Sequence, residues 1–245
     1  MKQKVSDYIA DRLAQEGISQ VFTVTGGGAM HLNDSLGHHP GLSCLYHHHE
    51  QAAAMAAEAY ARVDNRMAAV CVTSGPGATN AITGALCAWM DSIPMLVLSG
   101  QVRYDTTVRH SGLKIRTMGV QEYDITPSVE PMTKYAVMVT DPLTIRYHLE
   151  RAIYLAKTGR PGPCWLDLPL NVQSAVVETD DLKAYDPSED AKELPAPVSE
   201  ETVKQILEKL KLASQPLIFA GHGIRLAGAY DEFQHLVELL GIPVV

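Results

Sequence analysis

The sequence predicts an α/β fold, in which a mainly parallel sheet carries helices on both faces. Short apolar or β-branched segments of strand length alternate with longer segments whose apolar residues recur at helical spacing. Such alternation is typical of parallel sheets, because a crossover between parallel strands usually contains a helix. Two glycine-rich turns, 26–28 and 75–77, directly follow strand segments. Ligands bind beyond the carboxyl ends of the strands in these sheets, so we expect both turns at the ligand-binding edge.

The first half of the chain contains the clearest elements. Val5, Tyr8, Ile9 and Leu13 repeat at helical spacing, and Gly17 follows as a C-terminal stop. The elements expected after this helix are a strand at 21–24, a helix at 30–36, a strand at 42–46, an alanine-rich helix that begins at Glu50, a strand at 68–73 and a helix at 79–89.

One irregular segment interrupts the alternation. A buried strand is expected at 95–99, directly after Pro94. The stretch 100–119 has no clear period, and a loop of this length inside a compact domain is usually functional or mobile. The elements expected after it are a strand at 136–139, a helix at 142–157 and a strand at 164–168.

The chain is expected to contain two domains. Residues 1–178 form the first, and an acidic, proline-containing stretch at 179–198 has the composition of a solvated linker. Residues 199–245 begin a second unit with a helix after Ser199, a strand at 216–220, a helix that ends at Leu240 and a strand at 242–245. One strand–helix–strand unit cannot bury its own faces, so we expect a truncated second domain and a chain that is a fragment of a longer protein.

Composition argues against several classes of partner. The 245 residues carry a net charge of -8, which disfavours nucleic acids and anionic membrane surfaces. No stretch of about 18 apolar residues is present, and the acidic, amphipathic N-terminus does not resemble a secretory signal. The four cysteines are far apart and lie in apolar segments, which indicates reduced core thiols and a cytoplasmic protein. These are Cys44, Cys71, Cys87 and Cys164.

Glu50 is the first candidate for chemistry. It opens a helix whose next turns are almost all alanine, the best helix former. A helix so small on one side can approach another backbone or a flat ligand closely. An acid in its first turn is stabilised by the helix dipole while it is ionised, and burial would be needed to keep it protonated. The alternative is an ordinary buried helix whose first-turn glutamate is solvated.

The turn from Ser74 to Asn80 is the second candidate. Its glycines follow a strand and precede a helix, so exposed backbone N–H groups there suit an anion or a flat heteroaromatic ring. The alternative is a tight turn with no ligand. The Gly221-His222-Gly223 segment is interpreted only as a turn, because Leu226 stands where a third glycine would complete a dinucleotide-binding pattern.

Two other classes of site receive little support. The histidines at 38–39 and 47–49 are consecutive, and neighbouring residues of a strand point to opposite faces, so they rarely converge on one metal ion. No metal site is therefore expected within this chain. The sequence also lacks a Gly-x-Ser-x-Gly turn, so a hydrolase triad is unsupported.

Several motifs follow one another in a set order. They are Glu50 with its alanine-rich helix, Thr73-Ser74-Gly75-Pro76-Gly77-Ala78-Thr79-Asn80, Asp91-Ser92-Ile93-Pro94, Gly100-Gln101-Val102, Gln121-Glu122 and Gly159-Arg160-Pro161-Gly162-Pro163. Together they resemble the N-terminal pyrimidine-binding domain of thiamine-diphosphate enzymes, specifically of the acetolactate synthase branch. The resemblance covers essentially residues 1–178, and residues 199–245 resemble the start of that family's central domain. The set is far more specific than any one motif.

The resemblance implies a function and a cofactor site. It implies decarboxylation of a 2-keto acid, with pyruvate as the default donor, and transfer of the acyl unit to a carbonyl acceptor. Glu50 would hydrogen-bond a ring nitrogen of the cofactor's aminopyrimidine and act as a general acid/base through the cofactor. The cofactor-binding residues carried over are Glu50, Gly75, Pro76, Gly77 and Asn80, and those of the substrate pocket are Gly26, Gly27, Gly28, His49 and Gln121.

Other features implied by the resemblance lie partly outside this chain. The family binds Mg²⁺ and the cofactor's diphosphate in a C-terminal domain, to which nothing here corresponds, so this fragment alone is expected to be inactive. FAD in the central domain is left open. The active site of the family lies between subunits, which implies a homodimer or a tetramer.

Three segments depart from the family pattern. Val120 stands where acetolactate synthases commonly have phenylalanine, Thr25–Gly28 replaces a Pro-Gly-Gly turn, and the segment Tyr104–Arg116 is not theirs. These differences leave the acceptor open: a second keto acid is the default, and a keto sugar of a surface-polysaccharide pathway is the alternative. A third hypothesis is a non-catalytic dimerisation or regulatory module, which the intact Glu50 and Gly75–Asn80 disfavour.

Overall fold

The computed structural model describes residues 1–193 and 196–245. Within them the chain divides into two compact units, Met1–Lys192 and Glu193–Val245. None of the helices in the described residues is long and apolar enough to cross a membrane.

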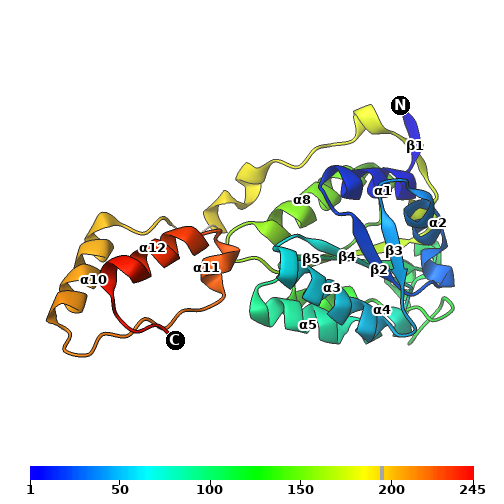
Figure 1. Ribbon diagram of the computed structural model, residues 1–245. Helices are drawn as coiled ribbons and strands as arrows, with labels where there is room; N and C mark the ends of the chain where they lie inside the picture. The colour runs from blue at the N-terminus through cyan, green and yellow to red at the C-terminus, as the bar shows by residue number, and fades with distance from the viewer. Residues whose placement is uncertain (194–195) are drawn as a thin grey trace. The chain divides into compact units, whose positions relative to one another are not determined.

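The first unit is built on a six-stranded parallel sheet (Figure 1). Its strand order is β3-β2-β4-β5-β7-β6. The strands are β2 (Gln20–Thr23), β3 (Ser43–Tyr46), β4 (Ala68–Val72), β5 (Met95–Gln101), β6 (Tyr135–Met138) and β7 (Pro163–Pro169). This arrangement confirms the predicted α/β fold. The central strands β4, β5 and β7 are buried along their whole length, as expected of strands covered on both faces.

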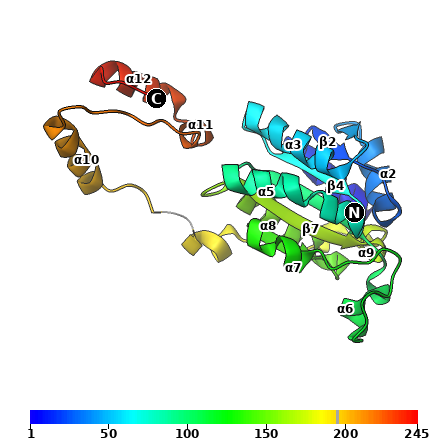
Figure 2. The same ribbon diagram turned by 90° about the horizontal axis from the view of Figure 1, so that it is seen from below.

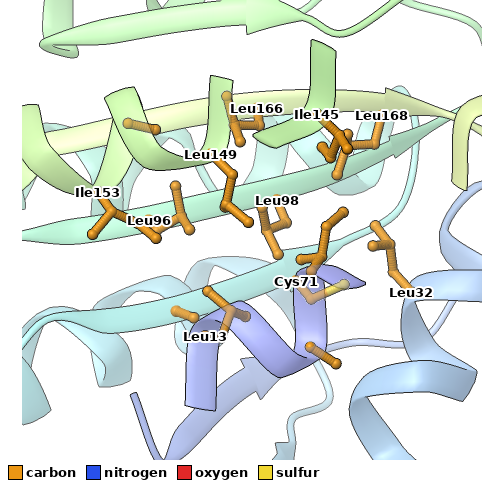
Figure 3. Packing of buried hydrophobic residues seen from close by; sticks show 14 of the residues in the cluster. Leu13, Leu32, Cys71, Leu96, Leu98, Ile145, Leu149, Ile153, Leu166 and Leu168 are labelled. Carbon is orange, nitrogen blue, oxygen red and sulfur yellow. The ribbon is translucent and has the colours of Figure 1, made fainter. Parts of the chain in front are cut away.

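Helices cover both faces of the sheet. The first face carries α1 (Val5–Gln15), α2 (Met30–His38) and α8 (Ile145–Lys157), whose apolar side chains pack with Leu96, Leu98 and Leu166 of the sheet (Figure 3). The opposite face carries α3 (Glu50–Asp64) and α5 (Ile82–Asp91). Val97 and Trp165 pack on that side because successive side chains of a strand point to opposite faces.

Small residues let α3 approach its neighbours closely. Ala53, Ala54 and Ala57 of α3 are fully buried. Gly84 of α5 lies directly against Ala54, where an added Cβ would come within 2.5 Å of the Ala54 Cβ. The alanine-rich sequence therefore serves close helix packing, and it holds the first turn of α3 at the edge of the sheet.

Several short elements were not expected from the sequence. β1 (Lys2–Lys4) and β8 (Val176–Glu178) pair antiparallel in a separate two-stranded sheet. Such short, partly polar strands have no clear apolar pattern. The other short helices of this unit are α4 (Pro76–Asn80), α6 (Val108–Ser111), α7 (Thr126–Val129) and α9 (Leu170–Gln173), and its 3₁₀ turns are η1 (Gly27–Ala29), η2 (Tyr104–Thr106), η3 (Glu130–Met132), η4 (Pro142–Thr144), η5 (Thr179–Asp181) and η6 (Pro187–Glu193).

The acidic stretch after residue 178 differs from the expected solvated linker. Residues 179–192 belong to the first unit. Leu182, Tyr185 and Asp190 are buried there, and Arg151 of α8 donates two hydrogen bonds to the Asp190 carboxylate, at 2.9 and 2.8 Å. The acidic composition indicates a solvated segment, but two apolar anchors and a paired carboxylate fasten it to α8.

The second unit consists of α10 (Glu200–Leu212), α11 (Gly223–Leu226) and α12 (Tyr230–Leu240). The strands expected at 216–220 and 242–245 are shorter than predicted: they meet in a single parallel bridge between Ile218 and Val244. The helix expected to end at Leu240 is divided, because Gly228 adopts a φ of +67° between α11 and α12. Gly221 and His222 form the turn before α11, and Gly223, which was predicted to belong to the turn, is the first residue of the helix.

Candidate active site

The candidate site lies at the carboxyl ends of β2 and β4. From β2 the chain continues into α2 on one face of the sheet, and from β4 it continues into α4 and α5 on the other. The order of the strands also changes direction here, since β3 lies on one side of β2 and β4 on the other. Such a switch point is where doubly wound sheets place their ligands. Both glycine turns, 26–28 and 75–77, are at this point.

Glu50 is the first residue of α3, and Asn80 is the last residue of α4. The Asn80 side-chain amide donates a hydrogen bond to Glu50 Oε2 at 2.9 Å. Among the described residues no hydrogen bond reaches Glu50 Oε1, and the Glu50 side chain is half-buried. One carboxylate oxygen is therefore held by the protein, and the other is available to a ligand.

The second glycine turn lies beside this free oxygen. A Cβ added to Gly77 would lie 3.3 Å from Glu50 Oε1 and 2.7 Å from the Thr73 methyl carbon. Gly75 has a φ of +55°, and a Cβ there would overlap the Gln121 carbonyl oxygen. Glycine is required at both positions, at Gly75 for conformation and space and at Gly77 for space. The turn also brings the Gln121 backbone to the site.

The first glycine turn packs directly on the second. The Gly28 N–H donates to the Thr73 hydroxyl at 3.0 Å, and a Cβ on Gly26 would come within 2.5 Å of the Thr73 methyl carbon. The buried Gln173 of α9 donates to the Gly28 carbonyl at 2.7 Å and so holds the turn from the other side. Gly27 is exposed, and nothing lies within 4 Å of its Cβ position.

The structure brings most of the expected site residues into contact with one another, but His49 and Pro76 are not among those linked by these contacts. Glu50, Gly75, Gly77, Asn80 and the Gln121 backbone are linked by the contacts above, and Gly26 and Gly28 join them through Thr73. The ring of His49 is used locally: its Nδ1 accepts the Gln51 N–H at 3.2 Å and caps α3, and the residue is exposed. Pro76 is also exposed, as the first residue of α4.

The irregular segment 103–118 has an ordered internal structure. The Glu122 carboxylate accepts backbone N–H groups from Val108 at 2.6 Å, Met118 at 2.8 Å and Gly119 at 3.2 Å. Asn171 accepts the Tyr104 N–H at 2.7 Å. Figure 2 shows the segment with α6 extending away from the sheet. Glu122 thus organises the loop that joins β5 to the site.

The supporting roles of four residues at the site were not predicted from the sequence. These residues are Thr73, Gln173, Glu122 as the organiser of the loop, and the fully buried Asp167 of β7. Burial raises the pKa of Asp167 to about 7, although hydrogen bonds from Ser99 and Gln101 oppose this shift. The signal for Asp167 was present, because an aspartate inside the apolar run Cys164–Leu168 must be paired once the strand is buried.

Among the described residues no group of three or more histidine, cysteine or acidic side chains could hold a metal ion. The histidines are engaged separately. His39 pairs with Asp11, His38 with Asp34, and His47 packs beside Phe22 with its Nδ1 3.0 Å from the Leu45 carbonyl.

Comparison with known proteins assigns both parts of the chain. Residues 3–122 match the N-terminal TPP binding domain of thiamine pyrophosphate enzymes, and residues 203–245 match the central domain of the same enzymes. The first match contains Glu50, both glycine turns and Gln121, and it ends at Glu122.

Similar curated proteins include acetolactate synthase large subunits. That of Lactococcus lactis subsp. lactis (strain IL1403) is 36% identical over 245 residues, which is 98% of this chain and 40% of that protein. That of Corynebacterium glutamicum is 38% identical over 230 residues, or 92% of this chain and 34% of that protein. The chloroplastic acetolactate synthase 1 of Oryza sativa subsp. japonica is 34% identical over 246 residues, or 99% and 36%.

The chain thus spans about 40% of the length of the first curated relatives. The two family matches lie in the same order as the two structural units, and the strand–turn–helix geometry around Glu50 and Gly75 falls inside the first match. The chain belongs to the thiamine pyrophosphate enzymes and carries the N-terminal TPP binding domain followed, from residue 203, by sequence of the central domain.

Proposed function

We propose that this chain is the N-terminal part of an acetolactate synthase-like carboligase. The whole enzyme would decarboxylate a 2-keto acid, with pyruvate as the first candidate, and transfer the acyl unit to a carbonyl acceptor. The observation that carries the proposal is the Glu50 carboxylate, with one oxygen fastened by Asn80 and the other free beside Gly77. The acetolactate synthase relatives, at 32 to 38% identity, support the same reaction class.

The residues present fit thiamine diphosphate. A planar ring needs a flat approach and a hydrogen-bonding edge, and Gly77 leaves the turn free of a side chain beside Glu50 Oε1. When bound, the cofactor supplies the electron sink for decarboxylation. Glu50 would hold and move a proton at a pyrimidine ring nitrogen, and Asn80 would orient its carboxylate. Pro76 would cover the ring beside the two glycines.

The remaining site residues are assigned to the substrate side. Gly26, Gly27 and Gly28 would form part of the pocket wall, with Gln121 opposite them across Gly75 and with His49 beside Glu50. The Gly28 turn is supported by Thr73 and Gln173. Gly27, which has open space around its Cβ position, is the member of this wall most accessible to a substrate.

Other parts of the proposal concern the whole enzyme. Mg²⁺ and the diphosphate would be bound by a C-terminal domain, so residues 1–245 alone would be inactive, and a flavin in the central domain stays open. The active unit would be a homodimer or a tetramer with the site between subunits. A cytoplasmic location is supported by the four free cysteines, two of them fully buried.

A keto sugar is the second candidate for the acceptor. The observation that favours it is the ordered segment 103–118, which departs from the acetolactate synthase pattern and is anchored through Glu122 next to Gln121. Val120, where those enzymes commonly have phenylalanine, is 84% exposed. Both features change the surface beside the acceptor side of the site.

The proposal is tested with the full-length protein and the Glu50→Gln variant. Glutamine keeps an acceptor for Asn80 but cannot exchange a proton, so we expect kcat for pyruvate consumption to fall by at least about 100-fold. Glu58→Gln, two turns further along α3 and bonded to Arg62, is the matched control and should retain most of the activity.

Calorimetry with thiamine diphosphate and magnesium, and mass spectrometry of the products, complete the test. Wild-type protein that binds no cofactor would favour the non-catalytic dimerisation or regulatory module. Full activity in Glu50→Gln would remove Glu50 from the mechanism. The mass of the product distinguishes a second keto acid from a keto sugar as acceptor.

A further inference from the structure

A buried chain of four polar side chains lies beneath the segment that carries Gln121. Ser99 and Gln101 belong to β5, and Trp165 and Asp167 belong to the neighbouring strand β7. Ser99 and Asp167 face each other in the parallel register. Ser99, Trp165 and Asp167 are fully buried and Gln101 is 1% exposed, so each of their polar groups needs a partner within the protein.

When Asp167 is ionised, the hydrogen bonds among these four side chains can run in one direction only. The Trp165 indole, which can only donate, donates to the Ser99 hydroxyl oxygen at 2.8 Å. Ser99 then donates its own proton to Asp167 Oδ1 at 2.6 Å. The other carboxylate oxygen, Oδ2, accepts from the Gln101 amide nitrogen at 3.1 Å.

Gln101 extends this series of hydrogen bonds from the sheet to the loop that follows it. Its Oε1 accepts the Val102 N–H at 3.0 Å, which sets the orientation of the side-chain amide. The second proton of its amide nitrogen is donated to the Tyr123 carbonyl at 2.7 Å. A reversed amide would present two acceptors to each other at both Asp167 and Tyr123, so Asp167 and the Val102 N–H together determine which atom of Gln101 meets the loop.

The Tyr123 carbonyl lies next to the functional end of the loop. Two residues earlier, Gln121 has a φ of +57°, and its carbonyl lies against Gly75 of the candidate cofactor turn. Between them, Glu122 binds the N–H groups of Val108, Met118 and Gly119. The position of Tyr123 therefore affects both Gln121 and the base of the segment 103–118.

We propose that Trp165, Ser99, Asp167 and Gln101 form a directional hydrogen-bonded strut that positions the Gln121 loop for the carbonyl acceptor. Asp167 and Gln101 are then positioning residues, since they act through the Tyr123 backbone. This inference rests on the proposed function, because it assigns the loop to the acceptor side of that site.

The test uses full-length enzyme with thiamine diphosphate and magnesium bound. Gln101→Met keeps the side-chain length but cannot donate to Tyr123, and Asp167→Asn keeps the shape but removes one acceptor. We expect each variant to raise the KM for the acceptor by about tenfold or more, which is the scale of one lost buried hydrogen bond. The Kd for thiamine diphosphate should stay within about threefold of wild type, because Glu50, Gly77 and Asn80 are untouched.

A double variant and a control separate positioning from general stability. A strut fails when any link is removed, so Gln101→Met with Asp167→Asn should be no worse than the more impaired single variant. Ser35→Ala is the control: Ser35 is also buried, its hydroxyl donates to the Asp7 carboxylate and accepts from the Ser6 hydroxyl, and none of these residues is hydrogen-bonded to the Gln121 loop. It should lower the Tm without changing the KM for the acceptor. In a double variant of Ser35→Ala and Gln101→Met, the fold-changes caused by the two substitutions should multiply.

Hydrogen exchange gives a readout that does not depend on activity. Amide exchange at residues 118–124 should be faster in Gln101→Met and Asp167→Asn than in Ser35→Ala. If wild-type enzyme consumes no pyruvate, the proposed function fails while exchange still tests the strut. If wild type is active and both variants keep the acceptor KM within twofold, the strut is overturned. Should Gln101→Met not fold, Ser99→Ala cuts the same chain, and an unchanged acceptor KM there overturns the proposal equally.

Discussion

Gly75 combines two requirements that no other residue type meets. Its φ of +55° lies in the region that L-residues rarely adopt, and a Cβ would overlap the Gln121 carbonyl oxygen. Gly27, in the other turn, has open space around its Cβ position and no positive φ. The two glycines therefore look equivalent in the sequence and differ in their physical role.

The pair provides a test at the scale of one methyl group. Gly75→Ala should lower the free energy of unfolding by about 2 kcal/mol or more, because backbone strain and overlap add. Gly27→Ala should change it by less than about 0.5 kcal/mol. Urea unfolding of both variants, followed by far-UV circular dichroism, measures the difference. Equal effects would mean that Gln121 does not lie against the Gly75 turn.

Asp167 makes stability depend on pH with a defined sign. Burial raises its pKa in the folded protein to about 7, above the unfolded value of about 4. Asp124 adds to the shift, and Ser99, Gln101 and Arg109 oppose it. The folded state binds the proton more tightly between these values, so this contribution is complete below about pH 4 and is lost as the pH rises to about 7.

Asparagine does not ionise, so a comparison of wild type with Asp167→Asn isolates the titration of Asp167. The free energy of unfolding of wild type minus that of the variant should fall as the pH rises from 5 to 7, with a slope of up to about 1.4 kcal/mol per pH unit. Above pH 8 the difference should be flat, because the carboxylate is then ionised in both states. Urea titrations at each pH measure it, and a difference that rises between pH 5 and 7 would contradict the assignment.

The residues proposed for the chemistry carry local sequence signals, whereas the residues that support them do not. Glu50, Gly75 and Asn80 belong to motifs with local signals, a helix start and a strand–turn–helix. Gln173 and Thr73 act through contacts with Gly28 that join distant parts of the chain. No local pattern encodes such pairs, so they were predictable only once the order of the strands was known.

The helix pair α3 and α5 shows how composition determines position. Ala54 and Gly84 meet where any larger residue would separate the helices. Gly84 lies inside a helix, where glycine is intrinsically about 1 kcal/mol less favourable than alanine. At this position the short packing distance outweighs the lower helix propensity of glycine.

A comparison of two helical glycines tests this balance. Gly84→Ala should destabilise the protein by about 1–3 kcal/mol through overpacking, despite the better helix former. Gly37→Ala in α2 should be neutral or stabilising by up to about 1 kcal/mol, because its Cβ would meet only the Tyr46 hydroxyl at 3.3 Å, at the end of an exposed side chain. Thermal unfolding gives both values. A stabilising Gly84→Ala would show that α3 and α5 are farther apart than described.

At the element scale, predictions succeeded where periodicity was strong. The six parallel strands and the helices on both faces follow from apolar runs and helical spacing. β1 and β8 were missed because three-residue, partly exposed strands leave no pattern. The strands expected at 216–220 and 242–245 form only one bridge, and Phe219, within the first of them, is 87% exposed, so apolar composition alone overestimated their length.

The extent of the first unit depends on one ion pair and two apolar side chains. Leu182 and Tyr185 are buried, and the Asp190 carboxylate accepts two hydrogen bonds from Arg151 and one from Tyr185 at 2.6 Å. Arg151 also lies over the Tyr135 ring, 4.7 Å from its centroid. The hydrogen bonds from Arg151 lower the pKa of Asp190. Residues 179–192 are thereby joined to α8 and β6.

Asp190→Asn tests whether this segment is part of the folded unit. Asparagine keeps the shape but loses the charge, and we expect the free energy of unfolding at pH 7 to fall by about 1–3 kcal/mol, since a mostly buried cation loses its partner. Asp105→Asn is the control, because Asp105 pairs with Arg103 at the surface and both side chains are more than half exposed, where such pairs contribute less than about 1 kcal/mol.

The pH dependence gives this prediction its second check. A lowered pKa means that the Asp190 contribution is present above the unfolded value of about 4 and is lost as the pH falls through the folded value. The difference between wild type and Asp190→Asn should therefore shrink below pH 4, whereas the Asp167 difference grows as the pH falls from about 7 to about 4 and is flat below that. Limited proteolysis should also cut 179–192 faster in Asp190→Asn than in Asp105→Asn. Equal cleavage and equal stability in the two variants would mean that the segment is solvated, and the first unit would then end near residue 178.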